Sequence, residues 1–284
     1  MRINKEHTFK DKVIWLTGAS SGIGEALAYE LSGFGAILIL SSRNESKLMK
    51  VKAQLPMNAD KAKVLVLDLE KLDELKDKTL EAMSFFGTID YFISNAGLAI
   101  RDYALNTTLE IDQKIMNINY FGPIIITKAL LPSFIEKNKG HIVVTSSLSG
   151  KYGVPKIAAY AASKHALHGF YETLRSEIID HNIQLTIIIP GIIKTAITTH
   201  ALTGTGEKFG KMEKTFQTAY PVEKAAERIV VAISKNKEEC FIGGSEGVTL
   251  YLNRLSPWLL RRFIRNHPIK KMRQFKNKFG FKRS

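Results

Sequence analysis

Short apolar runs rich in β-branched residues alternate along this chain with longer segments of helical pattern. The runs span Val13 to Leu16, Ala36 to Leu40, Lys63 to Leu67, Ile89 to Ile93, His141 to Thr145, Gln184 to Ile189 and Glu239 to Ile242. Most are apolar throughout, as in strands that are buried on both faces. The segments between them are long enough for crossover helices, so the pattern predicts an α/β fold with a doubly wound parallel sheet flanked by helices.

The charge distribution divides the chain into a nearly neutral body and a basic tail. Of the 41 Lys and Arg residues, 11 lie between Tyr251 and Ser284, where Asp and Glu are absent, whereas the first 250 residues carry 30 basic and 27 acidic side chains. We therefore expect one domain over residues 1–250 and a basic helical extension over residues 251–284. The hydrophobic content of 45% is ample for a buried core.

The sequence shows neither a secretion signal nor a metal-binding pattern. The N-terminal residues are too polar for a signal peptide, and no uninterrupted apolar run approaches the roughly 18 residues of a spanning helix, so we expect a cytoplasmic protein. Cys240 is the single cysteine and is expected to be a small buried hydrophobe. His165 and His168 lack the companions of a metal site, and we expect none.

A glycine-rich stretch, TGASSGIG at residues 17–24, separates the first expected strand from a helix. One interpretation is a flexible connector. The other is a loop whose bare backbone and helix N-terminus bind a phosphate group. The glycine spacing alone is a weak signal, so both interpretations stay open at this point.

The end of the second expected strand carries Ser42 and Arg43, about where NAD-binding chains place a carboxylate against the ribose 2′-hydroxyl. A cation here favours a 2′-phosphate and hence NADPH. The alternative is an exposed arginine that opens a helix, where its charge opposes the helix dipole.

Ser147 follows the fifth expected strand, and Tyr160 and Lys164 lie four residues apart on an expected helix, hence on one face. An ammonium about 4 Å from a phenol, at an effective dielectric constant of about 20, contributes about 4 kcal/mol, or about three pKa units. Such a tyrosine is a candidate general acid or base. The Tyr-Lys spacing by itself also fits an ordinary surface pair.

Taken together, these residues resemble the short-chain dehydrogenase/reductase family over roughly residues 11–244, within its hydroxysteroid-dehydrogenase-like branch. The matching motifs are the glycine turn (Thr17, Gly18, Gly22, Gly24), the aspartate after the third strand (Asp68), the NAG triplet (Asn95, Ala96, Gly97), the helix asparagine (Asn119), Ser147, Tyr160 with Lys164, and the PG motif with its threonine (Pro190, Gly191, Thr195). The resemblance implies a Rossmann-type fold.

The resemblance also implies nicotinamide-dependent interconversion of a carbonyl and an alcohol, and Arg43 makes NADP(H) the expected cofactor. Tyr160 would transfer the proton and Ser147 would hold the substrate oxygen. Lys164 would bind the nicotinamide ribose and lower the tyrosine pKa, and Asn119, unless it is only a packing amide, would position a water. The implied cofactor site comprises Thr17, Gly18, Ser20, Ser21, Gly22, Ile23, Gly24, Ser42, Arg43, Asp68, Leu69, Asn95, Ala96, Gly97, Tyr160, Lys164, Pro190, Gly191, Ile193 and Thr195.

The segment after the PG motif, residues 191–224, and the loop from Lys151 to Ile157 are expected to select the substrate. Thr203 to Gly206 suggests a mobile lid. Its surrounding apolar residues either cover a lipophilic carbonyl or alcohol substrate or pack on the sheet edge: Ile192, Ile193, Ala196, Ile197, Leu202, Phe209, Met212 and Phe216. A homodimer or homotetramer is expected.

The tail predicts a helix that Ser256 caps, Pro257 opens and Pro268 helps to end. Leu255, Leu259 and Phe263, with Leu260 and Ile264 beside them, would form its apolar side, opposite Arg254, Arg261 and Arg265, and Trp258 suits a membrane interface. This helix would either bind an anionic membrane surface or pack on the body.

Two other functional classes stay open. A dinucleotide-binding regulatory or scaffold protein with the same fold is one alternative, although such proteins usually lose the tyrosine or the lysine. Nucleic-acid binding through the tail is the other, and the tail lacks a known module or stacking platform.

Overall fold

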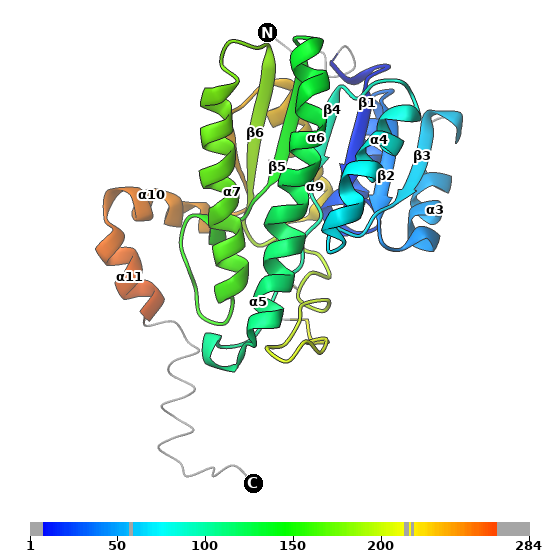
Figure 1. Cartoon of the computed structure of the whole chain (residues 1–284). Helices are drawn as coiled ribbons and strands as arrows, with labels where there is room; N and C mark the ends of the chain where they lie inside the picture. Colours follow the sequence, from blue (N-terminus) through cyan, green and yellow to red (C-terminus); the bar gives the residue numbers. More distant parts are fainter. Residues whose placement is uncertain (1–7, 57–58, 213–215, 217–218, 266–284) are drawn as a thin grey trace, which may run out of the picture. The chain divides into compact units, whose positions relative to one another are not determined.

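The computed structural model describes residues 8–56, 59–212, 216 and 219–265. All seven apolar runs form strands: β1 (Val13–Thr17), β2 (Ile37–Ser42), β3 (Ala62–Val66), β4 (Tyr91–Ser94), β5 (Gly140–Thr145), β6 (Ile183–Pro190) and β7 (Glu239–Ile242). They pair in parallel in the order β3-β2-β1-β4-β5-β6-β7 (Figure 1). The predicted doubly wound, Rossmann-type fold is confirmed.

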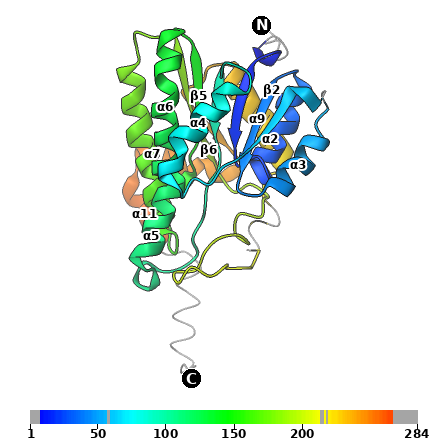
Figure 2. The ribbon, with the colours of Figure 1, turned by 45° about the vertical axis from the view of Figure 1, so that its right-hand side comes forward.

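Helices cover both faces of this sheet (Figures 1 and 2). They are α2 (Gly22–Gly33), α3 (Glu45–Ala53), α4 (Leu75–Ser84), α5 (Leu109–Met116), α6 (Gly122–Glu136), α7 (Ala158–Glu177) and α9 (Val222–Ser234). Helices α2 and α9 pack together against one face, where Leu27, Leu31 and Ile229 join the strand residues in the main core. Burial on both faces explains why the strands are apolar throughout.

The strand order reverses between β1 and β4. From β1 the chain proceeds outward to β2 and β3, and then returns to place β4 on the other side of β1. In open α/β sheets a ligand binds at the carboxyl ends of the strands at such a reversal. The residues that follow β1 and β4 are the glycine turn and the NAG triplet, so the topology brings these two motifs to one edge.

Cys240 was expected to be a small buried hydrophobe; it packs against the main core but is only half-buried. It lies on β7, the edge strand of the sheet, where only part of the side chain reaches the main core.

The stretch Leu109–Glu136 forms a continuous helix through α5, a π-helical turn (Asn117–Phe121) and α6. It is long and apolar enough to cross a membrane by length and composition, with a mean hydropathy of 1.3 in its most apolar window. Half of that window is buried inside the protein, as in the core helices of globular folds.

The chain divides into two compact units, residues 1–244 and residues 245–284. The described part of the second unit contains α10 (Val248–Leu255) and α11 (Pro257–Arg265). Ser256 separates them with a non-helical backbone, φ −147° and ψ 78°, because it precedes a proline. Pro257 opens α11 as predicted, but Leu255 and Arg254 belong to α10, so their expected place on the faces of one helix is wrong. Pro268 lies outside the described residues.

Candidate active site

The glycine turn between β1 and α2 is packed closely against its own backbone. A Cβ atom at Gly24 would lie 2.1 Å from the carbonyl oxygen of Gly18, and one at Gly18 would lie 2.8 Å from the Cα atom of Ala96. Gly18 and Gly22 also have positive φ angles, +69° and +59°, which favour glycine. The glycines are therefore required by close approach and conformation, which argues against a flexible connector.

The N-terminus of α2 faces the same turn. Ser21 is its N-cap residue, with an extended backbone and no capping hydrogen bond from its side chain. Helix N-termini present backbone N–H groups and a positive dipole end to anions. Ser20 and Ile23 are half-buried beside it. The turn has the form of a phosphate-binding loop.

Thr17 holds the NAG triplet against this turn. The backbone N–H groups of Asn95 and Ala96 donate to Thr17 Oγ1 at 3.1 and 3.2 Å, and Asn95 Nδ2 donates to the Thr17 carbonyl oxygen at 3.3 Å. Thr145 at the end of β5 donates to Asn95 Oδ1 at 3.4 Å. Hydrogen bonds thus link the ends of three neighbouring strands.

Ser42 and Arg43 lie at the same edge. The N–H of Ala19 in the glycine turn donates to the Ser41 carbonyl oxygen at 3.1 Å, which joins the turn to the end of β2. Ser42 Oγ accepts a hydrogen bond from Asn44 N at 3.2 Å. Asn44 then caps α3, so the exposed Arg43 precedes the helix instead of opening it.

Asp68 and Leu69 follow β3. Asp68 Oδ1 accepts a hydrogen bond from Glu70 N at 3.1 Å, and Leu69 is buried where a Cβ at Gly122 would meet it at 3.0 Å.

The PG motif returns the chain from β6 to the glycine turn. Pro190 ends β6, and Gly191 N donates to the Ile242 carbonyl oxygen at 2.8 Å. Ile193 is buried, and the Thr195 methyl group lies 3.2 Å from the position of a Cβ at Gly22.

Asn119 lies in the π-helical turn between α5 and α6 and is fully buried. Its Oδ1 accepts from Leu98 N at 2.7 Å, and its Nδ2 donates to the Leu98 carbonyl oxygen at 2.9 Å and to Ser163 Oγ at 3.0 Å. A Cβ at Gly97 would lie 3.3 Å from Asn119 Oδ1 and 3.6 Å from Lys164 Nζ. The asparagine therefore joins the NAG triplet to the helix that carries Lys164.

Lys164 is buried on α7, and its Nζ donates to the Thr145 carbonyl oxygen at 2.8 Å. Burial lowers its pKa from 10.5 to about 8. A lysine with this pKa exchanges its proton readily near neutral pH.

Tyr160 lies one helical turn before Lys164, whose Nζ is 5.7 Å from the centroid of the tyrosine ring. Burial raises the pKa of Tyr160, while a hydrogen bond with Ser147 and the charge of Arg101 lower it. In this structure burial has the largest effect, so the expected shift toward neutrality caused by Lys164 is not observed. The reason is that the low-dielectric surroundings disfavour both charged groups.

Arg101 is a candidate site residue that the sequence motifs do not indicate. It follows the NAG triplet by four positions and acts on Tyr160 through its charge. Its backbone N–H donates to the Leu202 carbonyl oxygen at 2.8 Å. No family motif or helical spacing pointed to this position.

The segment from Thr203 to Gly206 is held by the loop that follows β4. Gly204 N donates to Asp102 Oδ2 at 3.0 Å, and the Gly204 carbonyl oxygen accepts from Thr108 N at 3.1 Å. A Cβ at Gly204 would lie 2.3 Å from the Asn106 carbonyl oxygen. The glycine thus serves a close backbone contact, which argues against a freely mobile lid. Of the apolar residues nearby, Ile193 is buried and Met212 is exposed, while Ile192, Ala196, Ile197, Leu202, Phe209 and Phe216 are half-buried.

Comparisons with known proteins identify the family of this chain. A family model for short chain dehydrogenases matches residues 12–205. A dehydrogenase/reductase SDR family protein 7-like of Drosophila melanogaster is 37% identical over 253 residues, with 87% of this chain and 78% of the relative covered. Dehydrogenase/reductase SDR family member 7B of Mus musculus is 34% identical over 268 residues, with 93% and 83% covered.

Solved structures share the fold. A short-chain dehydrogenase from Streptomyces avermitilis superimposes with a TM-score of 0.75 at 25% identity, covering 96% of this chain and 98% of that one. A short-chain dehydrogenase/reductase from Burkholderia phymatum in complex with NAD gives 0.76 at 20% identity, covering 88% and 95%. The chain belongs to the short-chain dehydrogenase/reductase family, whose members are oxidoreductases that bind NAD or NADP and act on small molecules.

Proposed function

We propose that this protein is an NADP(H)-dependent oxidoreductase that interconverts a carbonyl and an alcohol, with Tyr160 as the general acid and base. The observation that carries the proposal is the convergence of Ser147, Tyr160 and Lys164. Ser147 is hydrogen-bonded to Tyr160, and Lys164 is buried beside the tyrosine ring. These groups adjoin the sheet edge where the glycine turn meets the NAG triplet.

When bound, the nicotinamide supplies or accepts the hydride. Because burial raises the pKa of Tyr160, its hydroxyl is protonated at neutral pH and is ready to give a proton to a carbonyl oxygen. Ser147 holds that oxygen by a hydrogen bond. Lys164, with its pKa of about 8, returns a proton toward the tyrosine, and the Arg101 charge stabilises the phenolate left behind.

The preference for NADP(H) rests on Arg43. Its side chain is exposed at the end of β2, and the neighbouring Ser42 carries no charge that would repel a 2′-phosphate. The cofactor-binding set named from the family motifs, with Asn119 as the residue that positions a water, is part of the same proposal.

The tail supplies the second part of the proposal, an association with anionic membrane surfaces. On α11, Trp258 and Phe263 are each 65% exposed and Leu259 is 45% exposed. Trp258 also lines a small hollow with Arg261, Arg262 and Arg265, and the Arg262 guanidinium lies 5.7 Å from the tryptophan ring centroid. Exposed aromatic residues among arginines suit the headgroup layer of a membrane.

We also propose a lipophilic substrate, a cytoplasmic location at a membrane surface, and a homodimer or homotetramer. Many members of the family oligomerise.

The deciding experiment is a screen of ketones and aldehydes followed at the NADPH absorbance band, with Tyr160→Phe as the test variant. We expect the variant to lose about a hundredfold to ten-thousandfold in turnover and to keep NADPH binding, because only the phenolic hydroxyl is removed. Tyr29→Phe removes a hydroxyl that contacts Glu25 and Gln54 and is the matched control. Retained turnover in Tyr160→Phe would require another proton donor.

A further inference from the structure

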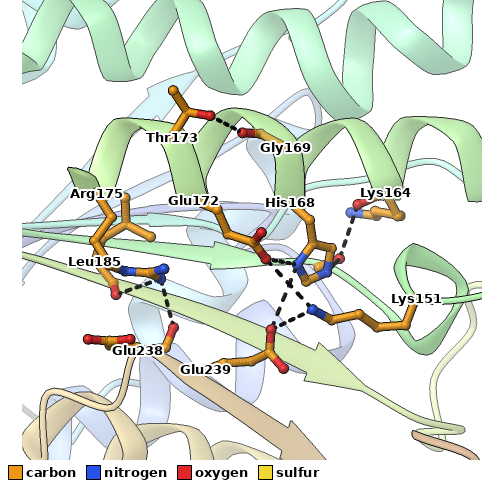
Figure 3. Close-up of polar contacts among 11 residues, drawn as sticks. Lys151, Lys164, His168, Gly169, Glu172, Thr173, Arg175, Leu185, Glu238 and Glu239 are labelled. Atoms are coloured by element: carbon orange, nitrogen blue, oxygen red, sulfur yellow. Dashed lines mark hydrogen bonds and ion pairs between the residues drawn. The ribbon is translucent and has the colours of Figure 1, made fainter. Parts of the chain in front are cut away.

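A cluster of charged side chains lies between α7 and β7, near Lys164 (Figure 3). His168 Nδ1 lies 3.3 Å from Glu172 Oε1 and 3.8 Å from Glu239 Oε2. Lys151 Nζ lies 2.7 Å from Glu239 Oε2 and 3.8 Å from Glu172 Oε1. The cluster thus joins α7 to the start of β7 and to the residue that follows a short 3₁₀ turn, Leu148–Gly150.

The other ring nitrogen of His168 reaches the residue directly before Ser147. His168 Nε2 lies 2.9 Å from Ser146 Oγ, which also contacts the Lys164 carbonyl oxygen at 3.4 Å. Both Ser146 and His168 are buried, at 2% and 6% exposure. The Ser146 N–H donates to the Ile188 carbonyl oxygen at 2.8 Å. The His168 ring therefore connects the ion pairs of Glu172 and Glu239 to Ser146. Ser146 in turn precedes Ser147 and contacts the backbone of Lys164.

Gly150 shows how closely the turn after Ser147 lies on α7. A Cβ at this position would be 2.6 Å from Ser146 Oγ, 2.8 Å from the Lys164 carbonyl oxygen and 3.0 Å from His168 Cδ2. The turn has no space to shift inward, and Lys151 ties its far end to Glu239.

Two other roles for the cluster fit less well. Its His and two carboxylates lie close enough to ligate a metal ion, but the Lys151 ammonium already contacts both carboxylates. Ser146, His168 and Glu172 stand in the order of a hydrolytic triad, but Ser146 is buried and its oxygen is enclosed by Lys164 and Gly150.

Both ring nitrogens of His168 have polar partners inside the protein. Burial and the Lys151 charge lower the pKa of His168, against the opposing effects of Glu239 and Glu172. Nδ1 faces Glu172 Oε1 and Nε2 faces Ser146 Oγ, so each ring nitrogen makes a separate polar contact.

We propose that His168 is a positioning residue that, through Ser146, holds the segment from Ser146 to Lys151 so that the Ser147 hydroxyl meets Tyr160. The proposal rests on the proposed function for its kinetic consequences only. His168 touches none of the reacting groups and acts on the angle at which Ser147 is presented.

Two substitutions separate the contacts of the two ring nitrogens. In His168→Gln the side-chain amide reaches the position of Nε2 and keeps the contact with Ser146. In His168→Asn the amide reaches only the position of Nδ1 and keeps the contact with Glu172. We expect His168→Asn to lower kcat about tenfold, the value of one buried hydrogen bond, with KM and the Kd for NADPH unchanged. His168→Gln should stay within about threefold of the unmodified protein.

Ser146→Ala removes the same contact from the other side and serves if a His168 variant does not fold. It should lose kcat to the same extent as His168→Asn, and the double variant should lose no more than either single one. Equal losses in His168→Gln and His168→Asn, or an unchanged kcat in His168→Asn and Ser146→Ala, would overturn the proposal.

Hydrogen exchange distinguishes failure of this proposal from failure of the proposed function. The backbone amides from Ser147 to Tyr152 should exchange faster in His168→Asn and Ser146→Ala than in the unmodified protein, and His168→Gln should match it. This measurement needs no substrate, so it remains decisive even if no carbonyl compound oxidises NADPH. Unchanged exchange in both variants would overturn the proposal.

Discussion

The two halves of the candidate site are built in different ways. On the nucleotide side, the glycine turn, Thr17 and the NAG triplet are joined mainly by backbone groups at short distances. On the proton-transfer side, Tyr160 and Lys164 owe their properties to burial, which raises the pKa of one and lowers that of the other. The first half depends on the shape of the chain, whereas the second depends on the dielectric surroundings of two side chains.

We expect the largest effect on stability and nucleotide binding when a methyl group is added to the glycine turn, on the nucleotide side of the site. Gly24→Ala would place a Cβ 2.1 Å from the Gly18 carbonyl oxygen and 2.7 Å from Asn95 Nδ2, so the turn must change shape. We expect a loss of more than about 3 kcal/mol in the free energy of unfolding, together with loss of NADPH binding. Urea denaturation and nucleotide fluorescence titration measure the two effects.

Gly33→Ala on the same helix is the matched control, because a Cβ there meets no atom within 4 Å. It should leave binding unchanged and stabilise the helix by up to about 1 kcal/mol. If Gly24→Ala behaved like Gly33→Ala, the close-packed turn would be refuted.

On the proton-transfer side, the buried Lys164 should make the stability of the protein depend on pH. Lys164 has a pKa of about 8 when folded and 10.5 as its ordinary value, so between these values the unfolded chain binds more protons than the folded one. The free energy of unfolding should therefore rise with pH across this window, by about 3 kcal/mol relative to a Lys164→Met variant. Denaturant titrations of both proteins from pH 7 to pH 11 measure the difference. Parallel pH profiles would show that the folded lysine titrates like an exposed one.

Substitution of Arg43 tests whether one side chain makes the nucleotide side of the site selective for NADPH over NADH. We expect the unmodified protein to bind NADPH more tightly than NADH, and Arg43→Ala to reduce that preference roughly tenfold to a hundredfold. Lys50→Ala, on the exposed part of α3, is the control for a general loss of charge. Equal affinities for both nucleotides in the unmodified protein, by fluorescence titration, would end the NADP(H) assignment.

The arginines of the tail differ from the buried Lys164 because their charges lie at exposed positions. Full-length protein should sediment with vesicles of anionic lipid and not with neutral ones. Each of Arg261→Gln and Arg265→Gln should weaken this binding about fivefold, corresponding to about 1 kcal/mol per charge near an anionic surface. Glu223→Gln, far along the chain on α9, is the control. Failure of the full chain to pellet with anionic vesicles at low salt would contradict the membrane proposal.

The two units of the chain, and the two halves of the site, differ in how much of their structure can be predicted from the sequence. All seven strands were predicted because burial on both faces leaves an apolar run that can be read locally. The start of the tail helix was predicted from Ser256 and Pro257, yet the separate helix α10 before it was missed, since helical spacing continues from Leu255 to Leu259 in the sequence. Thr203 to Gly206 suggested mobility because its glycines and threonines are typical of loops, and only the contact with Asn106 shows why Gly204 is needed.

The sequence by itself determined the parallel α/β fold, the family and the identity of the residues at the sheet edge, because strand patterns and motif spacings are local properties of the chain. Only the tertiary structure decided how the pKa values of Tyr160 and Lys164 shift. The burial of Lys164, the desolvation of Tyr160 and the approach of Arg101 all depend on segments that are distant in the sequence. The same holds for His168, whose contacts with Ser146 and Glu239 form only when α7, the turn after β5 and β7 come together. Electrostatic energies depend on distance and on the exclusion of water, and folding sets both.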